Sequence, residues 1–138
     1  MTGTYGSGKT YFAFALIREA FRVMRKKGYF WPKYYSSTAL DAKLRKASMH
    51  EDGDEYTLRE IGEEDLLFID DLGKETRSDR LKRQYFEIIN YRYSKKLPTI
   101  VTSNYTLDQL SEIIDGSISS RMQEWMFLKF PNIDMRKA

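Results

Sequence analysis

Two spacings of apolar residues alternate along the chain and predict helices separated by short strands. After a glycine-rich start, apolar side chains recur at helical spacing as far as Gly28 and predict a first helix. Aromatic residues in 29–36 favour a strand. Apolar residues in 40–47 indicate a short helix, which Ser36 or Ser37 is placed to cap.

The same alternation continues in the second half of the chain. After a polar loop over 50–55, the continuous apolar run 66–69 is typical of a strand buried on both faces. We expect a long helix from Ser78 to Lys95, and the β-branched residues of 99–103 predict the next strand.

The last part of the chain predicts two further helices and a final strand. Thr106 and Gln109 form the capping-box pattern of a helix that we expect to end near Gly116. A short helix over 118–122 precedes a last strand over 125–130. Because strands alternate with helices, the pattern predicts an α/β fold with a mostly parallel sheet.

Length and composition restrict the chemistry that this chain can carry. The 138 residues predict one domain over 1–138. Without cysteine there is no disulfide framework and no thiol nucleophile, and a single histidine, His50, argues against a histidine metal cluster or a Ser-His-Asp triad. No apolar run approaches the ~18 residues that a membrane span needs, and no signal peptide is visible. We therefore expect a soluble, cytoplasmic protein without a membrane partner.

Charge adds only a weak indication of a partner. The formal net charge is +3, which fits weak attraction to nucleic acid, but acidic and basic residues are mixed along the chain. Basic residues cluster within 22–27, within 77–83 and at 95–96, where each cluster taken alone is an ordinary solvated helix face.

A phosphate-binding loop is the strongest motif. Residues 3–10 match G-x-x-x-x-G-K-[ST] without deviation: Gly3, Thr4, Tyr5, Gly6, Ser7, Gly8, Lys9 and Thr10. Such a loop directs backbone amides and the positive end of the following helix at phosphate oxygens. In this motif Lys9 reaches the β- and γ-phosphates, and the Thr10 hydroxyl is a ligand of Mg²⁺.

One feature departs from this motif. A phosphate loop normally follows a buried strand, and here only Met1 and Thr2 precede Gly3. We expect either that the chain is truncated at its N-terminus or that the sheet is completed in another way.

Two carboxylates follow the apolar run of 66–69. Asp70 and Asp71 stand at the carboxyl end of the predicted strand, where parallel sheets bind their ligands. In a phosphate-loop enzyme Asp70 holds Mg²⁺, largely through bound water, and Asp71 polarises the attacking water. We therefore expect amides near Gly8, the Lys9 ammonium and the Asp70 carboxylate to converge on one Mg²⁺-bound triphosphate.

Three further side chains are candidates. Asn104 ends the next strand, where it either orients water beside the γ-phosphate or simply begins a turn. Arg121 and Arg136 are able to stabilise phosphate charge, although composition alone does not select them among the arginines.

These motifs, in this order, resemble the AAA+ ATPase domain of bacterial and phage helicase loaders of the DnaC/DnaI type. The most telling stretches are IDDLGKE at 69–75, LPTIVTSN at 97–104 and SRM at 120–122. The IstB transposition ATPases are similar in the same motifs. The resemblance implies a P-loop NTPase of the AAA+/ASCE class, folded as a three-layer sandwich. Compared with the family, we expect this chain to lack the strand before the phosphate loop and the N-terminal region with which loaders bind the helicase.

The resemblance also implies roles for the candidate residues. Lys9 and Thr10 would bind nucleotide and Mg²⁺, with Asp70 and Asp71 as the acidic pair. Asn104 would be the first sensor, and Arg121 the arginine finger acting on ATP of a neighbouring subunit. Arg136 would be a second sensor, which is the loosest of these matches.

The implied function is an ATP- and Mg²⁺-dependent ATPase that forms homo-oligomers and delivers a hexameric replicative helicase to single-stranded DNA. We expect a basic groove on the 78–95 helix to contribute to DNA binding. A transposition helper is the alternative within the same class, and a non-hydrolysing adaptor or fragment that binds AAA+ partners is the alternative outside it. A nucleoside kinase is disfavoured because Asp71, Asn104 and Arg121 suit attack by water in an oligomer.

Overall fold

The computed structural model describes residues 1–28, 30–50, 53–74, 78–131 and 133–135. Its elements, in chain order, are α1 (Lys9–Met24), the 3₁₀ turn η1 (Arg25–Lys27), β1 (Pro32–Ser36), α2 (Ser37–Ala47), α3 (Gly53–Gly62), β2 (Leu66–Asp70), α4 (Asp79–Ser94), β3 (Thr99–Val101), α5 (Leu107–Ile113) and α6 (Gly116–Gln123).

The three strands form a parallel sheet in the order β1-β2-β3. All five residues of the central strand β2 are buried, as its uninterrupted apolar sequence predicts for a strand covered on both faces. The register places Ser36 of β1 opposite Asp70 and Val101 of β3 opposite Ile69. The carboxyl ends of all three strands therefore meet at one edge of the sheet.

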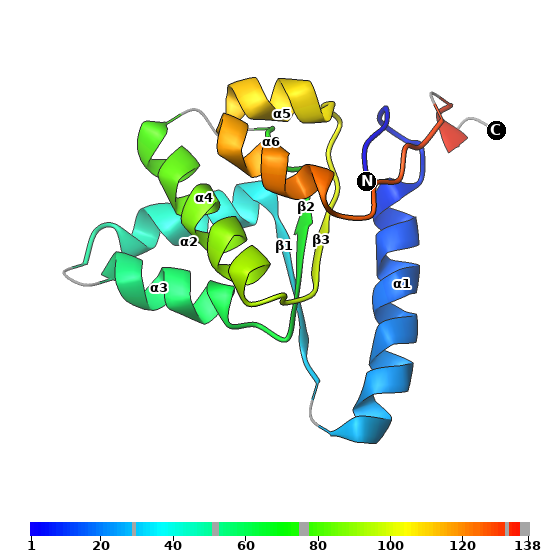
Figure 1. The fold of residues 1–138 in the computed structure, drawn as a ribbon, viewed down its shortest axis with the longest axis horizontal. Coiled ribbons are helices and arrows are strands. Elements are labelled where there is room, and N and C mark those ends of the chain that lie inside the picture. The colour runs from blue at the N-terminus through cyan, green and yellow to red at the C-terminus, as the bar shows by residue number, and fades with distance from the viewer. Residues whose placement is uncertain (29, 51–52, 75–77, 132, 136–138) are drawn as a thin grey trace.

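Helices cover both faces of this sheet (Figure 1). Helix α1 lies alone on one face, over a small buried cluster that contains Ala13, Leu66 and Phe68. Helices α2 to α6 lie on the other face over the main core, which includes Leu40, Ile69 and further residues from every element of that layer. The arrangement confirms the predicted α/β sandwich with a mostly parallel sheet.

Caps in the sequence fix the starts of three helices. Side-chain oxygens of Ser36, Ser78 and Thr106 accept backbone amides at the starts of α2, α4 and α5, and Thr106 forms the predicted capping box with Gln109. The sequence predicted that a helix ends near Gly116, and the structure differs. Gly116 begins α6 after α5 has ended at Ile113, because Asp115 caps the new helix by accepting the Ser117 amide.

Helix α3 was not predicted, and its first residues fall in the expected polar loop over 50–55. Only Thr57, Ile61 and Gly62 of this helix are buried, so its apolar stripe is too thin to read in the sequence. Asp54 and Glu55 lie in its first turn, where negative charge favours a helix.

The residues before the phosphate loop continue the sheet. Thr2 forms single parallel bridges to Ser103 beyond β3 and to Lys129, and the expected strand over 125–130 is reduced to that second bridge. Met1 and Thr2 thus stand between β3 and the 128–130 segment.

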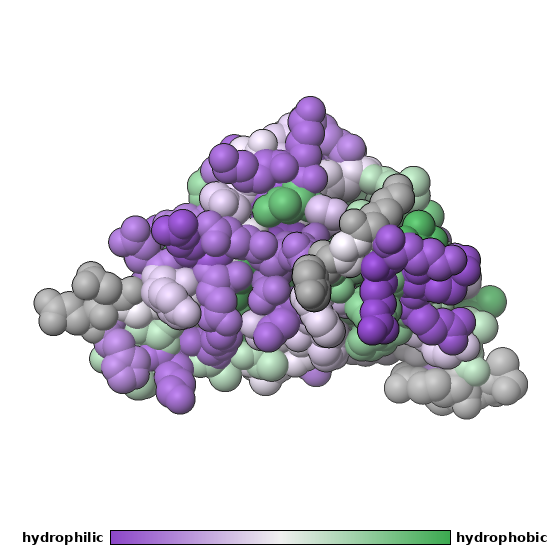
Figure 2. Space-filling view, turned by 90° about the horizontal axis from the view of Figure 1, so that it is seen from below, coloured by the Kyte–Doolittle hydropathy of each residue, from purple (hydrophilic) through white to green (hydrophobic). Residues whose placement is uncertain are grey.

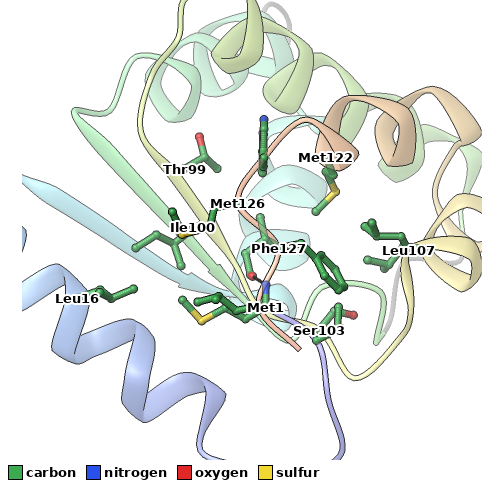
Figure 3. Close-up of a pocket in the computed structure, with 14 residues that line it drawn as sticks. Met1, Leu16, Thr99, Ile100, Ser103, Leu107, Met122, Met126 and Phe127 are labelled. Atoms are coloured by element: carbon green, nitrogen blue, oxygen red, sulfur yellow. Dashed lines mark hydrogen bonds between the residues drawn. The ribbon is translucent and has the colours of Figure 1, made fainter. Parts of the chain in front are cut away.

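An apolar cavity of about 210 Å³ opens beside these residues (Figure 3). Met1, Ile100 and Phe127 are among its lining side chains, together with residues of α1, α5 and α6. Thr2 therefore joins the two segments at the carboxyl end of the sheet, whereas the cavity separates β3 from residues 126–128 toward the amino end of β3. Among the described residues, no helix is long and apolar enough to cross a membrane.

Candidate nucleotide-binding site

The phosphate loop has the backbone geometry that its motif requires. Gly6 and Gly8 have φ values of 75° and 86°, in the left-handed region that glycine adopts most readily. Gly8 is also the N-cap of α1, and neither a side-chain cap nor an acidic residue occupies the first turn of that helix. The first amides of α1 are therefore available to an anion.

Lys9 is folded into the loop. Its side chain is 5% exposed, and Nζ donates to the carbonyl oxygens of Gly3 and Thr4, at 2.7 Å each. Burial lowers the pKa of Lys9, and the charges of Asp71 and Asp70 oppose this shift. The ammonium is held by neutral oxygens, which a phosphate is suited to replace because its negative charge adds Coulomb attraction to the hydrogen bond.

The acidic pair lies beside the loop. The Thr10 hydroxyl donates to Oδ1 of Asp70 at 2.8 Å, which links the last residue of the motif to the end of β2. Asp71 follows with a φ of 59°, unusual for a residue with a side chain. The Asp70 carboxylate is therefore within reach of the glycine turn, as the sequence prediction requires.

Asn104 connects the two halves of the site. Its Oδ1 accepts from Lys9 Nζ at 2.9 Å, and its Nδ2 donates to Oδ1 of Asp71 at 2.9 Å. The structure thus brings together five of the predicted residues: Lys9, Thr10, Asp70, Asp71 and Asn104. Asn104 does more than begin a turn, because its side chain contacts both Lys9 and Asp71.

Arg121 lies elsewhere. Its guanidinium carbon is 5.2 Å from the ring centre of Phe86 and 5.9 Å from that of Tyr93, both on α4, and Nη1 donates to the Ser117 carbonyl. Among the described residues it makes no hydrogen bond or ion pair with the phosphate loop. Arg136 lies outside the described residues.

The residues present fit a magnesium nucleotide. The described chain holds no group of three or more His, Cys, Asp or Glu side chains placed for a metal ion. Proteins usually hold Mg²⁺ through one or two carboxylates completed by water and phosphate oxygens. Thr10 and Asp70 would supply the protein oxygens, and Lys9 with the amides of α1 would hold the phosphates.

Two site residues were missed in the sequence. Thr102 is fully buried, and its hydroxyl donates to Asp70 Oδ1 while it accepts the Asp71 amide at 3.0 Å. Tyr34 lies two residues before the end of β1, and burial, the Asp70 charge and a hydrogen bond to Asp70 raise its pKa. The pairing of strands brings these two hydroxyls to the Asp70 carboxylate. In the sequence, the position of Thr102 two residues before Asn104 is the one sign that it belongs to the site.

Replacing Thr102 by valine should reduce both stability and activity. Valine keeps the shape but leaves the Asp71 amide and one Asp70 oxygen without this partner, at a cost of about 1–3 kcal/mol in unfolding free energy. Asp70 is the carboxylate expected to hold Mg²⁺, so the loss of this outer hydrogen bond should lower ATP turnover roughly 10–100-fold. Thr102→Ser, which keeps the hydroxyl, is the control, and equal turnover of the two variants would contradict this role.

Comparison with known proteins places this site in a family. The model of the family described as IstB-like ATP binding protein matches residues 1–124. The phage-like element PBSX protein XkdC of Bacillus subtilis (strain 168) is 29% identical over 131 residues, which cover 90% of this chain and 46% of that protein. The uncharacterized protein YqaM of the same strain is 26% identical and is covered to 39%, so the chain spans less than half the length of both curated relatives.

Solved structures agree with the fold. The crystal structure of the DnaC helicase loader superposes with a TM-score of 0.78 at 26% identity, over 94% of this chain and 76% of that one. The replication initiator DnaA, solved with AMPPCP and single-stranded DNA, gives a TM-score of 0.75 at 21% identity over 94% of this chain and 38% of that one, which shows a shared fold.

The family match covers the phosphate loop, the acidic pair and Asn104, which the fold assembles into one site. The chain belongs to the IstB-like ATP-binding proteins, as an AAA+ ATP-binding domain related to the DnaC-type helicase loaders.

Proposed function

We propose that residues 1–138 form the ATPase domain of a helicase-loader-type protein, which hydrolyses ATP with Mg²⁺ and assembles with copies of itself. In this role it delivers a hexameric replicative helicase to single-stranded DNA. The observation that carries the proposal is the hydrogen-bonded chain from Lys9 through Asn104 to Asp71, beside the Thr10–Asp70 bond.

This chain of contacts supports hydrolysis as well as binding. Lys9 and the α1 amides are placed to hold the phosphates, and Thr10 and Asp70 to hold the metal ion, which withdraws charge from the phosphates when bound. Asp71 and Asn104 touch each other at 2.9 Å, so both are placed to orient one water molecule. Asp71 would accept a proton from that water as it attacks phosphorus.

Assembly supplies what the single chain lacks. Arg121 makes its contacts with Ser117, Phe86 and Tyr93, away from the phosphate loop of its own chain. In this proposal it acts on ATP held by a neighbouring subunit, and Arg136 acts as a second sensor.

Two substitutions test the proposal. Lys9→Ala should weaken ATP binding, because it removes the cation from the phosphate site. Asp71→Asn should retain ATP while hydrolysis falls roughly 10²–10⁴-fold, the usual contribution of a general base. Binding is measured with a fluorescent ATP analogue and turnover by phosphate release, with and without EDTA, which should stop turnover.

A matched control uses Asp79→Asn on the exposed start of α4. It makes the same chemical change outside the site and should leave both measurements unaltered. Unchanged hydrolysis in Asp71→Asn would contradict the assignment, whereas an absence of hydrolysis in the unaltered protein with ATP bound would favour the adaptor.

A transposition helper is the second candidate, because the chain belongs to the IstB-like family and IstB proteins resemble the loaders in the same motifs. The same site would serve both functions, so the partner decides between them. Capture of a replicative helicase by the ATP-bound Asp71→Asn protein supports the loader, and capture of a transposase supports the helper.

A further inference from the structure

Positive charge is concentrated at the N-terminal end of the chain. Residues 1–28 contain six basic residues and one acidic residue, a formal +5, whereas the remainder contains 17 basic and 19 acidic residues, a formal −2. Of the six, Lys9 is buried in the phosphate loop. The remaining cations belong to the second half of α1 and to η1, so the basic character of the protein lies at one end of one helix.

Two aromatic rings lie at this end of α1, the half-buried Phe21 and the exposed Trp31. The Arg25 guanidinium lies 5.5 Å from the ring centre of Phe21, and the Phe21 and Trp31 rings are 6.3 Å apart. Trp31 is 63% exposed. A hollow beside these rings is lined by Arg18, Glu19, Phe21, Arg22, Arg25 and Lys26. Seen from this end of the sheet, hydrophilic side chains gather over the end of α1 (Figure 2).

The basic residues of α4, where the sequence predicted a DNA groove, are largely engaged within the fold. Arg80 pairs with Asp54, and Arg92 is fully buried. The Phe86 and Tyr93 rings of this helix are covered by Arg121. Helix α4 therefore offers few free cations and no exposed aromatic ring.

We propose that the end of α1 is a binding site for single-stranded nucleic acid, with a base stacking on the exposed ring of Trp31 and the backbone following Arg18, Arg25 and Lys26. This inference rests on the nucleic-acid partner of the proposed function and assigns it a surface. Among the described residues Arg18, Arg25 and Lys26 form no ion pair, whereas Arg22 pairs with Glu19. An exposed aromatic ring beside such cations favours a nucleic acid over an acidic protein, because any base stacks on a ring while a carboxylate does not.

Neighbouring charge restricts the path of the strand. On the other side of Trp31 a second hollow is lined by acidic residues that include Glu63, Glu64 and Asp65. Phosphates are repelled there, so the strand runs from Trp31 along the basic end of α1. It therefore stays at the opposite end of the sheet from the phosphate loop, and oligonucleotide and ATP are able to bind together.

The test measures binding of a fluorescein-labelled oligo(dT) to the whole chain by anisotropy at several salt concentrations. Trp31→Ala should weaken binding roughly tenfold through the loss of one stacked base, and Trp31→Phe should restore most of it. Arg25→Gln with Lys26→Gln should make the slope of log affinity against log salt shallower by about 1.4, as expected for two lost phosphate contacts on a single strand.

The matched control removes the same charge from α4, with Arg83→Gln and Lys95→Gln, which are both exposed. Affinity and slope should stay unchanged in it, and ATP binding should be retained by every variant. Loss of oligo(dT) binding in the α4 pair but not in the α1 variants overturns the assignment and leaves the proposed function standing.

Two other results also overturn it. If polyglutamate competes as well as unlabelled oligo(dT), the surface recognises negative charge alone. If the unaltered protein binds ATP but not oligo(dT), the nucleic-acid part of the proposed function fails together with this site.

Discussion

Replacing Arg121 by alanine is expected to leave ATP binding intact while hydrolysis by the assembled protein falls roughly 10³–10⁵-fold, the contribution of an arginine supplied in trans. The reason is electrostatic: the transferred phosphoryl group gains charge at its outer oxygens, and a neighbouring guanidinium neutralises it. Turnover is measured by phosphate release over a range of protein concentrations, because the proposed contribution of Arg121 requires assembly.

A mixing experiment separates this role from a structural one. Arg121 stacks on Phe86 and Tyr93, so its removal also takes away packing within the subunit. Lys9→Ala lacks the phosphate-binding cation but keeps Arg121, and Arg121→Ala has the reverse defect. Mixing the two inactive proteins should restore part of the turnover, since the Arg121 of one subunit serves the ATP of the other. Normal turnover of Arg121→Ala alone at high concentration would refute the assignment.

Replacing Arg92 by alanine is expected to have the largest effect on stability. Its side chain is fully buried, and it donates to the carbonyl oxygens of Gly62, Glu64 and Pro98 and to the Thr99 hydroxyl at 2.6–2.9 Å. Burial lowers its pKa to about 10. These bonds join α4 to the chain entering β2 and β3, so one side chain aligns the starts of two strands.

The expected loss in unfolding free energy is roughly 3–5 kcal/mol, because several buried oxygens lose their donor at about 1–3 kcal/mol each. For a domain of this size it corresponds to a fall in Tm of roughly 10–20 °C. The exposed Arg83→Ala on the same helix should change the unfolding free energy by less than about 0.5 kcal/mol. Arg92→Lys keeps the charge but loses the planar fork and should fall between the two. Equal melting of the alanine variants would contradict this role.

Local signals in the sequence are sufficient for much of the fold. The apolar run of β2 and the caps at Ser36, Ser78 and Thr106 act through adjacent residues, and the structure matches them. Helix α3 was not predicted because few of its residues are buried, and its packing against α2 and α4 decides which ones.

The candidate site divides in the same way. The phosphate loop and the Asp70–Asp71 pair are contiguous motifs whose residue types carry their chemistry, so the sequence by itself determined the nucleotide-binding character of this protein. Tertiary structure alone decided that Asn104 joins Lys9 to Asp71, that Thr102 holds Asp70, and that Arg121 turns away from its own loop. Those contacts span neighbouring strands and packed helices, and no local spacing encodes which side chains the pairing of strands brings within a hydrogen bond.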